Sequence, residues 1–305
     1  MAIEKVCVLG APADQGQPLV AALLAKGFNI TAGVRRTDAM VGTPFPDLPT
    51  VHADITDADS MAQAFAGQDA AAFHLPFEFE RARAASFGRA IAEGATRAGL
   101  QKIVFNTACF VADYDLNLSA HDGRRDIEAA LKATGIPCVF IEPVVFMDNM
   151  YRIWTRPLIM REGVFAYPAK SSLKIDWVCL EDVAQAMTSA LLTNAADGCH
   201  VPLGGPESLI GDEVAERLSQ ALGKPIRFQS LEPDEFASRM SKLVTGSGEI
   251  APNSIYHGMA AFYSWYNAQP QSPLTVDRSI AADLLGVTPT PLVEWAKSQN
   301  WTAGL

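Results

Sequence analysis

The sequence predicts an α/β fold, in which a doubly wound parallel sheet is followed by a smaller, mostly α-helical domain. Short apolar segments alternate with amphipathic helical patterns through the first half of the chain, as in a parallel sheet covered by helices on both faces. The first apolar segment, residues 5–9, leads directly into Gly10, a turn and a helical pattern. That order is typical of the corner of an α/β sheet that binds phosphate at a helix N-terminus.

Each element of the predicted sheet follows from a short apolar run or from a helical pattern. The strands are predicted at residues 5–9, 29–34, 50–53, 70–74, 102–106 and 138–141, with helices between them at 17–26, 59–66, 79–98 and 123–133. Each helix is followed by a glycine that suits a left-handed C-terminal cap, namely Gly27, Gly67, Gly99 and Gly135. Right-handed crossovers place a ligand crevice at the carboxyl ends of such strands.

The pattern changes after Pro143, which predicts two domains. We expect residues 1–150 to form a dinucleotide-binding domain and residues 151–305 a smaller substrate or partner domain. The expected elements of the second half are strands at 174–179 and 200–203, helices at 181–193 and 212–222, and mostly helical structure from 226 onward. The helix at 181–193 should return to the sheet. No flexible linker is visible, so the domains should pack tightly.

The composition is that of a soluble globular protein, with 49% hydrophobic and 19% charged residues among 305. No apolar run approaches the roughly 20 residues that span a bilayer, and the N-terminus enters a strand without room for a cleavable signal. We therefore expect a cytoplasmic protein. The net charge of −10, without a long basic run, argues against direct binding of nucleic acid. A monomer and a homodimer both stay open.

The cysteines and histidines give no indication of a metal. The five cysteines lack close pairing and mostly lie in apolar runs, which favours buried free thiols over a disulfide or a metal site. The five histidines are dispersed, and no His, Cys or carboxylate cluster has the spacing of metal ligands. No metal site is predicted.

The turn after the first strand carries an incomplete dinucleotide fingerprint. Ala13 replaces the glycine that would give the backbone its closest approach to a phosphate. The carboxylate of Asp14 would repel a pyrophosphate unless it points outward. An ordinary strand–turn–helix therefore stays open as the alternative. We expect Gly10, Ala13, Gln15 and Gly16 to bind the pyrophosphate, and we count Pro12 and Asp14 of the same turn among the cofactor-binding residues.

Residues after the second and third strands indicate which dinucleotide is bound. An acidic residue after the second strand usually binds the ribose 2′-hydroxyl of NAD, whereas arginine suits a 2′-phosphate. Arg35 and Arg36 stand there, so we expect NADP(H) in preference to NAD(H), the alternative being a solvated basic turn. Asp54 and Ile55 follow the third strand, where the aspartate could meet the adenine or cap a helix.

The ends of the fourth and sixth strands are expected near the nicotinamide. His74 and Pro76 end the fourth strand, and a catalytic role for this histidine competes with simple filling of the crevice. Pro143 and Phe146 follow the sixth strand and could wall off one face of the nicotinamide ring, with a role in the core equally open.

Together these motifs resemble the NmrA-like family of atypical short-chain dehydrogenase/reductases, in register over nearly the whole chain. The resemblance implies an NAD(P)-binding Rossmann domain with a small C-terminal domain, and a family that holds both NADPH-dependent reductases of quinones and aromatic compounds and non-catalytic redox sensors. The motifs that carry it include Gly10 with Gln15-Gly16, Val34-Arg35-Arg36, Asp54-Ile55-Thr56-Asp57, Gly135-Ile136-Pro137, Glu142-Pro143, Phe146-Met147-Asp148-Asn149, Glu181-Asp182-Val183-Ala184 and Leu203-Gly204-Gly205-Pro206-Glu207.

The same resemblance shows that the usual catalytic pair is missing. The Tyr-x-x-x-Lys of active short-chain dehydrogenases falls on Ala120 and Arg124, and the usual serine falls within Asn106 and Thr107. Alanine cannot transfer a proton, whereas Arg124 could still bind the ribose or a phosphate. The catalytic candidates are therefore His74, Thr107, Arg124 and Tyr151. Further proton donors considered are His121, Tyr256 and His257.

The leading hypothesis is an oxidoreductase that binds NADP(H) and transfers hydride to a small apolar acceptor, quinone-like or an aromatic carbonyl compound. Many rings at helical spacing between residues 256 and 266 could line a pocket for it, although a core-facing helix or a subunit contact explains them as well. The expected cofactor site is completed by Asn106, Thr107, Arg124, Pro143 and Phe146. The alternative is a non-catalytic NADP(H) sensor, and a scaffold that binds no cofactor is the third hypothesis.

Overall fold

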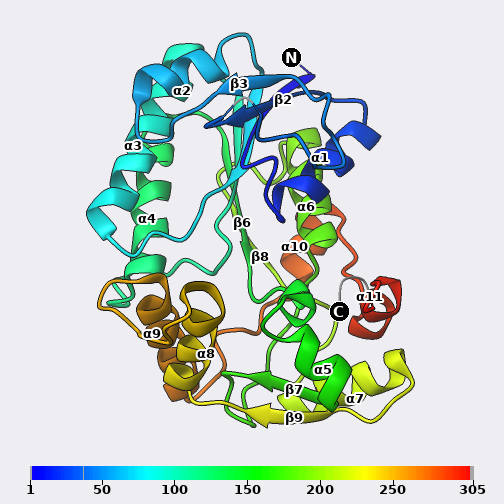
Figure 1. Cartoon of the computed structure of the whole chain (residues 1–305). Helices are drawn as coiled ribbons and strands as arrows, with labels where there is room; N and C mark the ends of the chain where they lie inside the picture. The colour runs from blue at the N-terminus through cyan, green and yellow to red at the C-terminus, as the bar shows by residue number, and fades with distance from the viewer. Residues whose placement is uncertain (1, 37, 303–305) are drawn as a thin grey trace. The chain divides into compact units, whose positions relative to one another are not determined.

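The computed structural model of this protein describes residues 2–36 and 38–302, and it confirms the predicted fold class (Figure 1). Within these residues the main sheet has seven strands in the order β3-β2-β1-β4-β5-β6-β8, and each pairing from β3 to β6 is parallel. The strands are β1 (Lys5–Leu9), β2 (Asn29–Val34), β3 (Thr50–His52), β4 (Ala70–His74), β5 (Lys102–Asn106), β6 (Cys138–Pro143) and β8 (His200–Leu203).

Helices cover both faces of this sheet, as the alternating pattern predicts. On one face α2 packs against α3 and α3 against α4, and on the other α1 packs against α6 (Figure 1). All four predicted cap glycines have positive φ. The helix predicted at 123–133 begins earlier, at Ser119. The helices are α1 (Gly16–Ala25), α2 (Ala58–Phe65), α3 (Arg81–Ala98), α4 (Ser119–Lys132), α6 (Leu180–Leu192) and α10 (Arg278–Leu285).

The core of the sheet is built around a row of aromatic rings on adjacent strands. The parallel register places Phe73, Phe105 and Phe140 side by side, and all three are fully buried. Ile91 of α3 and Ile127 of α4 belong to the same cluster. Burying a side chain of this size stabilises a fold by roughly 1.5–3 kcal/mol, so this row fixes both the register and the helices that cover it.

The strand order reverses its direction of growth between β1 and β4. From β1 the chain adds β2 and β3 on one side, then returns to place β4, β5 and β6 on the other side. The connections after β1 and β4 therefore diverge and leave a crevice at the carboxyl ends of these two strands. This point of the sheet is where the candidate site lies.

The chain divides into two compact units. The first consists of the described parts of Met1–Pro143 with Leu180–Pro202 and Ser279–Val287. The second consists of Val144–Cys179, Leu203–Arg278 and the described part of Thr288–Leu305. The helix predicted at 181–193 is α6, and it belongs to the first unit with the sheet.

The second unit is mostly helical but contains a small sheet that the sequence patterns did not reveal. Its two strands, β7 (Val164–Tyr167) and β9 (Arg227–Ser230), are parallel. The strand predicted at 174–179 is wrong, because this segment forms only isolated bridges at Ile175 and Val178. The remaining elements are the 3₁₀ helix η1 (Met147–Tyr151), α5 (Arg156–Glu162), α7 (Gly211–Leu222), α8 (Pro233–Thr245), α9 (Ile255–Ala268) and α11 (Leu292–Ser298).

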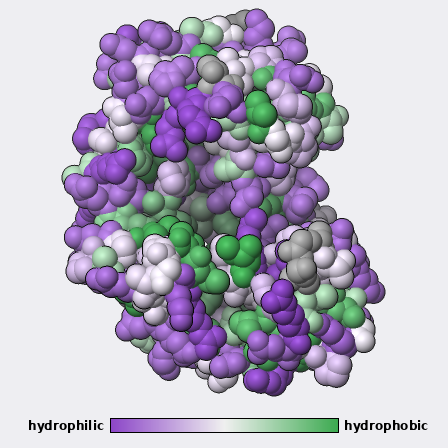
Figure 2. Space-filling model, viewed as in Figure 1, coloured by the Kyte–Doolittle hydropathy of each residue, from purple (hydrophilic) through white to green (hydrophobic). Residues whose placement is uncertain are grey.

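The face of the first unit that Figure 2 draws is mainly hydrophilic. Figure 2 shows purple, hydrophilic side chains over most of the region where Figure 1 places α2, β2 and β3. Among the described residues, none of the helices has both the length and the apolar character needed to cross a bilayer.

Candidate functional site

A pocket of about 1140 Å³ opens in the first unit at the carboxyl ends of β1, β2, β3 and β4. It collects residues from four separate turns, each of which follows one of these strands. Eleven of the predicted site residues line it: Gly10, Pro12, Ala13, Asp14, Gln15, Arg35, Arg36, Asp54, Ile55, His74 and Pro76. Parallel strands bring these turns to one edge of the sheet, which explains why residues up to 66 positions apart share one pocket.

The turn after β1 is tight because two glycines leave no room for side chains. Gly10 has φ of +78°, and a Cβ there would lie 2.7 Å from Cε1 of His74. A Cβ on Gly16 would lie only 2.1 Å from the carbonyl oxygen of Gly10. The backbone N–H groups of Gly16 and Gln17 both donate to the Ala13 carbonyl, at 2.9 and 3.0 Å. The start of α1 is thereby held directly behind the pocket wall.

His74 lies against this turn at the end of β4. Burial lowers the pKa of His74 to about 4, with the charge of Arg124 acting in the same direction and Asp14 opposing it. The imidazole is therefore neutral at pH 7 and is a weak proton donor there. Asp14 and His74 both line the pocket.

Arg124 does not line the pocket but supports its wall from behind. The side chain is 2% exposed, and its Nη2 donates to the carbonyls of Leu75 and Pro76 at 2.6 and 3.1 Å. The guanidinium lies over the rings of Phe77 and Phe105, with its carbon 5.0 and 5.8 Å from their centroids. Burial lowers the pKa of Arg124 to about 10, so it stays charged at neutral pH. It is a positioning residue for the segment after β4.

The side chains of Asn106 and Thr107, at the end of β5, form hydrogen bonds within the protein. Asn106 Nδ2 donates to Gln15 Oε1 at 2.9 Å, and its Oδ1 accepts from the Ala108 N–H at 2.8 Å. The fully buried hydroxyl of Thr107 lies 2.6 Å from the Cys109 carbonyl oxygen. Ala108 lines the pocket with φ of 60°, a conformation that costs roughly 1–3 kcal/mol for a residue other than glycine and is often found at functional sites.

The basic residues after β2 and the acidic residue Asp54 after β3 line the same pocket. Arg36 is exposed and forms an ion pair with Asp38 at 3.2 Å. Asp54 accepts hydrogen bonds from the Thr56 hydroxyl and N–H, which lower the pKa of Asp54, and the charge of Arg35 adds to this. The sequence left open whether Asp54 caps a helix. In the structure the N-cap of α2 is Asp57 and not Asp54.

Two predicted site residues belong to the second unit. Phe146 forms an isolated bridge with Val178, and the Tyr151 hydroxyl donates to the Asn300 carbonyl at 2.5 Å. Pro143, the last residue of β6, is buried in the first unit and does not line the pocket. The rings between 256 and 266 include Tyr263, which is buried and shares a hydrogen bond of 2.5 Å with Tyr167. These rings therefore contribute to the core of the second unit.

Sequence reasoning missed the part of the lining that lies just beyond β4. Phe77, Glu78, Arg83 and Phe87 all face the pocket, from the β4–α3 connection and the first turns of α3. Phe77 and Glu78 gave no signal in the sequence beyond their position after a predicted strand. Arg83 and Phe87 stand four residues apart on α3, a spacing that is common on any packed helix. Arg83 also pairs with Glu78 at 3.3 Å.

Two buried histidines of the first unit make its stability depend on pH. Burial lowers the pKa of His121 to about 3, as it lowers that of His74 to about 4. A lowered pKa means that the unfolded chain binds the proton more tightly. The stability that each neutral ring contributes is thus complete above about pH 6.5 and is lost as the pH falls toward 4 and 3.

The substitution His121→Phe should therefore flatten the pH dependence of unfolding. The new ring can keep the contact with Phe110, whose centroid lies 5.0 Å from that of His121. We expect the loss of unfolding free energy between pH 7 and pH 4 to shrink by about 3 kcal/mol, measured by urea denaturation at both pH values. The matched change His52→Asn, at an exposed histidine, should leave the difference unaltered. Equal pH profiles for the His121 variant and the unchanged protein would contradict the buried neutral state.

Comparison with known proteins gives one family match and several relatives. Residues 3–296 match the sequence model of the NmrA-like family. The chain is 27% identical over 176 residues to an NAD(P)H azoreductase of Xenophilus azovorans, a stretch that covers 57% of this chain and 58% of the azoreductase. The chain thus matches less than two thirds of that relative's length.

Solved structures share the fold at low sequence identity. An NADPH-dependent quinone oxidoreductase of Escherichia coli complexed with NADPH is 20% identical, with a TM-score of 0.77 over 95% of this chain and 98% of that one. A triphenylmethane reductase of Citrobacter sp. complexed with NADP(H) is 21% identical, with a TM-score of 0.77 over 96% and 99%. The negative transcriptional regulator NmrA in complex with NADP is 17% identical, with a TM-score of 0.74 over 99% of each chain.

Proposed function

The chain belongs to the NmrA-like family, and from this premise we propose that it is an NADPH-dependent oxidoreductase. Its acceptor in this proposal is a small, planar, apolar molecule such as a quinone or an aromatic carbonyl compound. The observation that carries the proposal is that one pocket holds the glycine turn after β1, Arg35 after β2 and Asp54 after β3. Relatives named as an azoreductase, a quinone oxidoreductase and a triphenylmethane reductase support reduction of a conjugated acceptor.

The pocket residues fit a dinucleotide with a 2′-phosphate. A volume of about 1140 Å³ is large enough for such a ligand, since pockets for drug-sized molecules run to roughly 1,000 Å³. In this assignment the turn from Gly10 to Gly16 holds the pyrophosphate, Arg35 the 2′-phosphate and Asp54 the adenine. Arg36 is already paired with Asp38, so Arg35 is the better candidate for the phosphate.

The chain's own contribution to the reaction is then mainly orientation. When bound, the dinucleotide supplies the hydride, and a conjugated acceptor can take it directly. His74 lies at the end of β4 where the nicotinamide ribose is expected, and its neutral ring can donate a hydrogen bond there. Arg124 holds the segment from Leu75 to Phe77 in place behind the site. Correct placement of two reactants can by itself supply a large share of a rate enhancement.

A redox sensor that binds NADP(H) without turnover is the second candidate. Its support is that no tyrosine or lysine stands at the positions of the usual pair, where Ala120 and Arg124 are found. The buried hydroxyl of Thr107 is also engaged with a backbone carbonyl, and therefore it is not free to exchange protons with a substrate.

Steady-state oxidation of NADPH against a panel of acceptors distinguishes the two functions. The panel contains quinones, azo dyes, triphenylmethane dyes and aldehydes, and cofactor affinity is measured in parallel by calorimetry. We expect turnover with at least one conjugated acceptor and less with simple aliphatic aldehydes, because hydride addition to these leaves a strongly basic alkoxide, whereas a conjugated acceptor delocalises the added charge. Tight cofactor binding without any turnover would favour the sensor, and no binding of either dinucleotide would reject both functions.

A further inference from the structure

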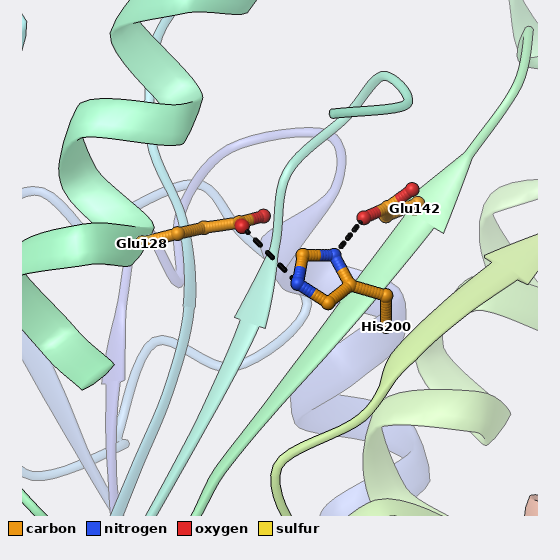
Figure 3. A group of neighbouring side chains, drawn as sticks. All are labelled: Glu128, Glu142 and His200. Carbon is orange, nitrogen blue, oxygen red and sulfur yellow. Dashed lines mark hydrogen bonds and ion pairs between the residues drawn. The ribbon is translucent and has the colours of Figure 1, made fainter. Parts of the chain in front are cut away.

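A second group of chemically active side chains lies in the first unit, outside the dinucleotide pocket. Glu128 comes from α4, Glu142 from β6 and His200 from β8, and one ligand atom of each lies within 4.8 Å of the others. Figure 3 shows the imidazole of His200 between the two carboxylates. Its Nδ1 bonds to Glu142 Oε1, and its Nε2 lies 3.5 Å from Glu128 Oε2. None of the three residues lines the pocket described above.

The two carboxylates are buried, and one of their oxygens lacks a partner. Glu128 is 2% exposed and Glu142 is 6% exposed. Among the described residues Oε1 of Glu128 has no hydrogen-bond donor, although it is fully shielded from solvent. Figure 3 shows the carboxylate of Glu128 directed toward the side of His200 and Glu142. Buried acidic oxygens of this kind are normally paired with a cation or coordinate a metal.

The bond to Glu142 fixes the orientation of the imidazole. In the neutral tautomer that donates from Nδ1 to this carboxylate, Nε2 keeps its lone pair and is directed at Glu128. A carboxylate that holds the far nitrogen of a histidine is the usual support of a metal-binding imidazole, because it orients the ring and makes it a stronger ligand. Glu142 would play this supporting role, and Glu128 and His200 would be the ligands.

Lys132 now occupies the position that a metal ion would take. Its Nζ lies 2.6 Å from His200 Nε2 and 3.7 Å from Glu128 Oε2. The lysine is four residues after Glu128 on α4, and its side chain is 46% exposed. A long side chain at the surface can swing into water at small cost, and the contacts of Lys132 with Glu128, His200 and the face of Phe140 are all made through its terminal ammonium.

We propose that Glu128 and His200, supported by Glu142, form a binding site for a divalent transition-metal ion such as Zn²⁺, in competition with the ammonium of Lys132. One imidazole and one carboxylate suit zinc and its neighbours better than Mg²⁺ or Ca²⁺, which prefer oxygen ligands alone. Water would complete the coordination from the exposed side of His200. With fewer protein ligands than a closed structural site, this one should bind its ion reversibly.

Titration of the full-length protein with Co²⁺ and then Zn²⁺ tests the site without reference to activity. Co²⁺ reports binding through its visible absorption, and displacement by Zn²⁺ gives the zinc affinity. The decisive variant is Lys132→Met, which keeps the apolar stem but removes the competing charge. We expect it to bind Zn²⁺ about tenfold more tightly than the unchanged protein.

Control variants separate a local effect from a change in net charge. Lys26→Met makes the same charge change at an exposed lysine after α1, and it should leave zinc affinity unaltered. Glu128→Gln and His200→Asn should each abolish the cobalt spectrum, whereas His52→Asn at an exposed histidine should keep it. Circular dichroism establishes that each variant is folded.

Two outcomes would overturn the proposal. One is equal zinc affinity for the Lys132 and Lys26 variants, which would mean that the ammonium does not compete for this position. The other is a cobalt spectrum that survives in folded His200→Asn, which would place the ion elsewhere. Because Lys132 is on the surface, its variant should fold normally, so the first comparison is decisive even if a buried variant does not fold.

Discussion

Replacing Arg35 by glutamate is expected to weaken NADPH binding by about a hundredfold or more while changing NADH binding only a few-fold. Arg35 is exposed at the end of β2 and lines the pocket together with Asp54. A hydrogen bond between charged groups contributes about 1.5–3 kcal/mol, which is roughly 10–100-fold in affinity, and a carboxylate adds repulsion of the 2′-phosphate. NADH lacks this phosphate, so the same substitution should change the affinity for NADH only slightly. Calorimetry or fluorescence titration with both dinucleotides measures the two affinities.

The matched control for this prediction is Arg36→Glu. It makes the same charge change one residue later, at a side chain that already pairs with Asp38 on the surface. Exposed ion pairs contribute about 0–1 kcal/mol, so we expect a much smaller loss of NADPH affinity than at Arg35. Equal losses for NADPH and NADH in the Arg35 variant would mean that Arg35 does not meet the 2′-phosphate, and the proposed cofactor preference would fall.

The substitution Gly16→Ala is expected to destabilise the first unit by about 3 kcal/mol and to remove dinucleotide binding with it. The added Cβ would lie 2.1 Å from the Gly10 carbonyl oxygen and 2.7 Å from the Ala11 Cα. Both neighbours are backbone atoms of the turn after β1, and therefore neither can rotate away as a side chain would. The added Cβ can be accommodated only if α1 moves away from β1, and this movement would widen the proposed pyrophosphate site. Urea denaturation gives the stability, and titration with NADPH gives the affinity.

Gly27→Ala provides the comparison at the other end of the same helix. Gly27 has φ of +82°, but a Cβ there would meet no atom within 4 Å. Only the strain of the left-handed backbone is then expected, at about 1 kcal/mol, with dinucleotide affinity unchanged. If Gly16→Ala proved no more destabilising than Gly27→Ala, the close approach of α1 to β1 could not be what shapes the site.

The elements of the sheet could be predicted because each depends on local sequence. Runs such as 70–73 and 103–105 are continuously apolar, which indicates strands buried on both faces, and cap glycines such as Gly99 mark helix ends. The second sheet was missed for the opposite reason. Its strands β7 and β9 have four residues each and pair across a long separation in the chain, so neither has a recognisable pattern without its partner.

In the candidate site too, some residues could be predicted from local sequence and others depended on tertiary packing. Gly10 and Arg35 could be assigned because each immediately follows a predicted strand, and His74 because it ends one, since parallel strands bring such positions to one edge. Arg124 was expected to face a ligand, but the structure directs its guanidinium to the carbonyls of Leu75 and Pro76. The direction of a side chain on a helix depends on how that helix packs, and no spacing in the sequence specifies it.

By itself, the sequence determined the parallel sheet, the order of its strands and helices, and the glycine turn with its neighbouring arginines. These follow from hydrophobic periodicity and backbone sterics, which act over a few residues. Only the tertiary structure decided that Arg124 supports the pocket wall, and that Glu128, Glu142 and His200 meet on α4, β6 and β8. Such contacts form between residues far apart in the chain, so they depend on how the helices and strands pack. A buried charged side chain is stable only when the packed fold places an oppositely charged or hydrogen-bonding group beside it.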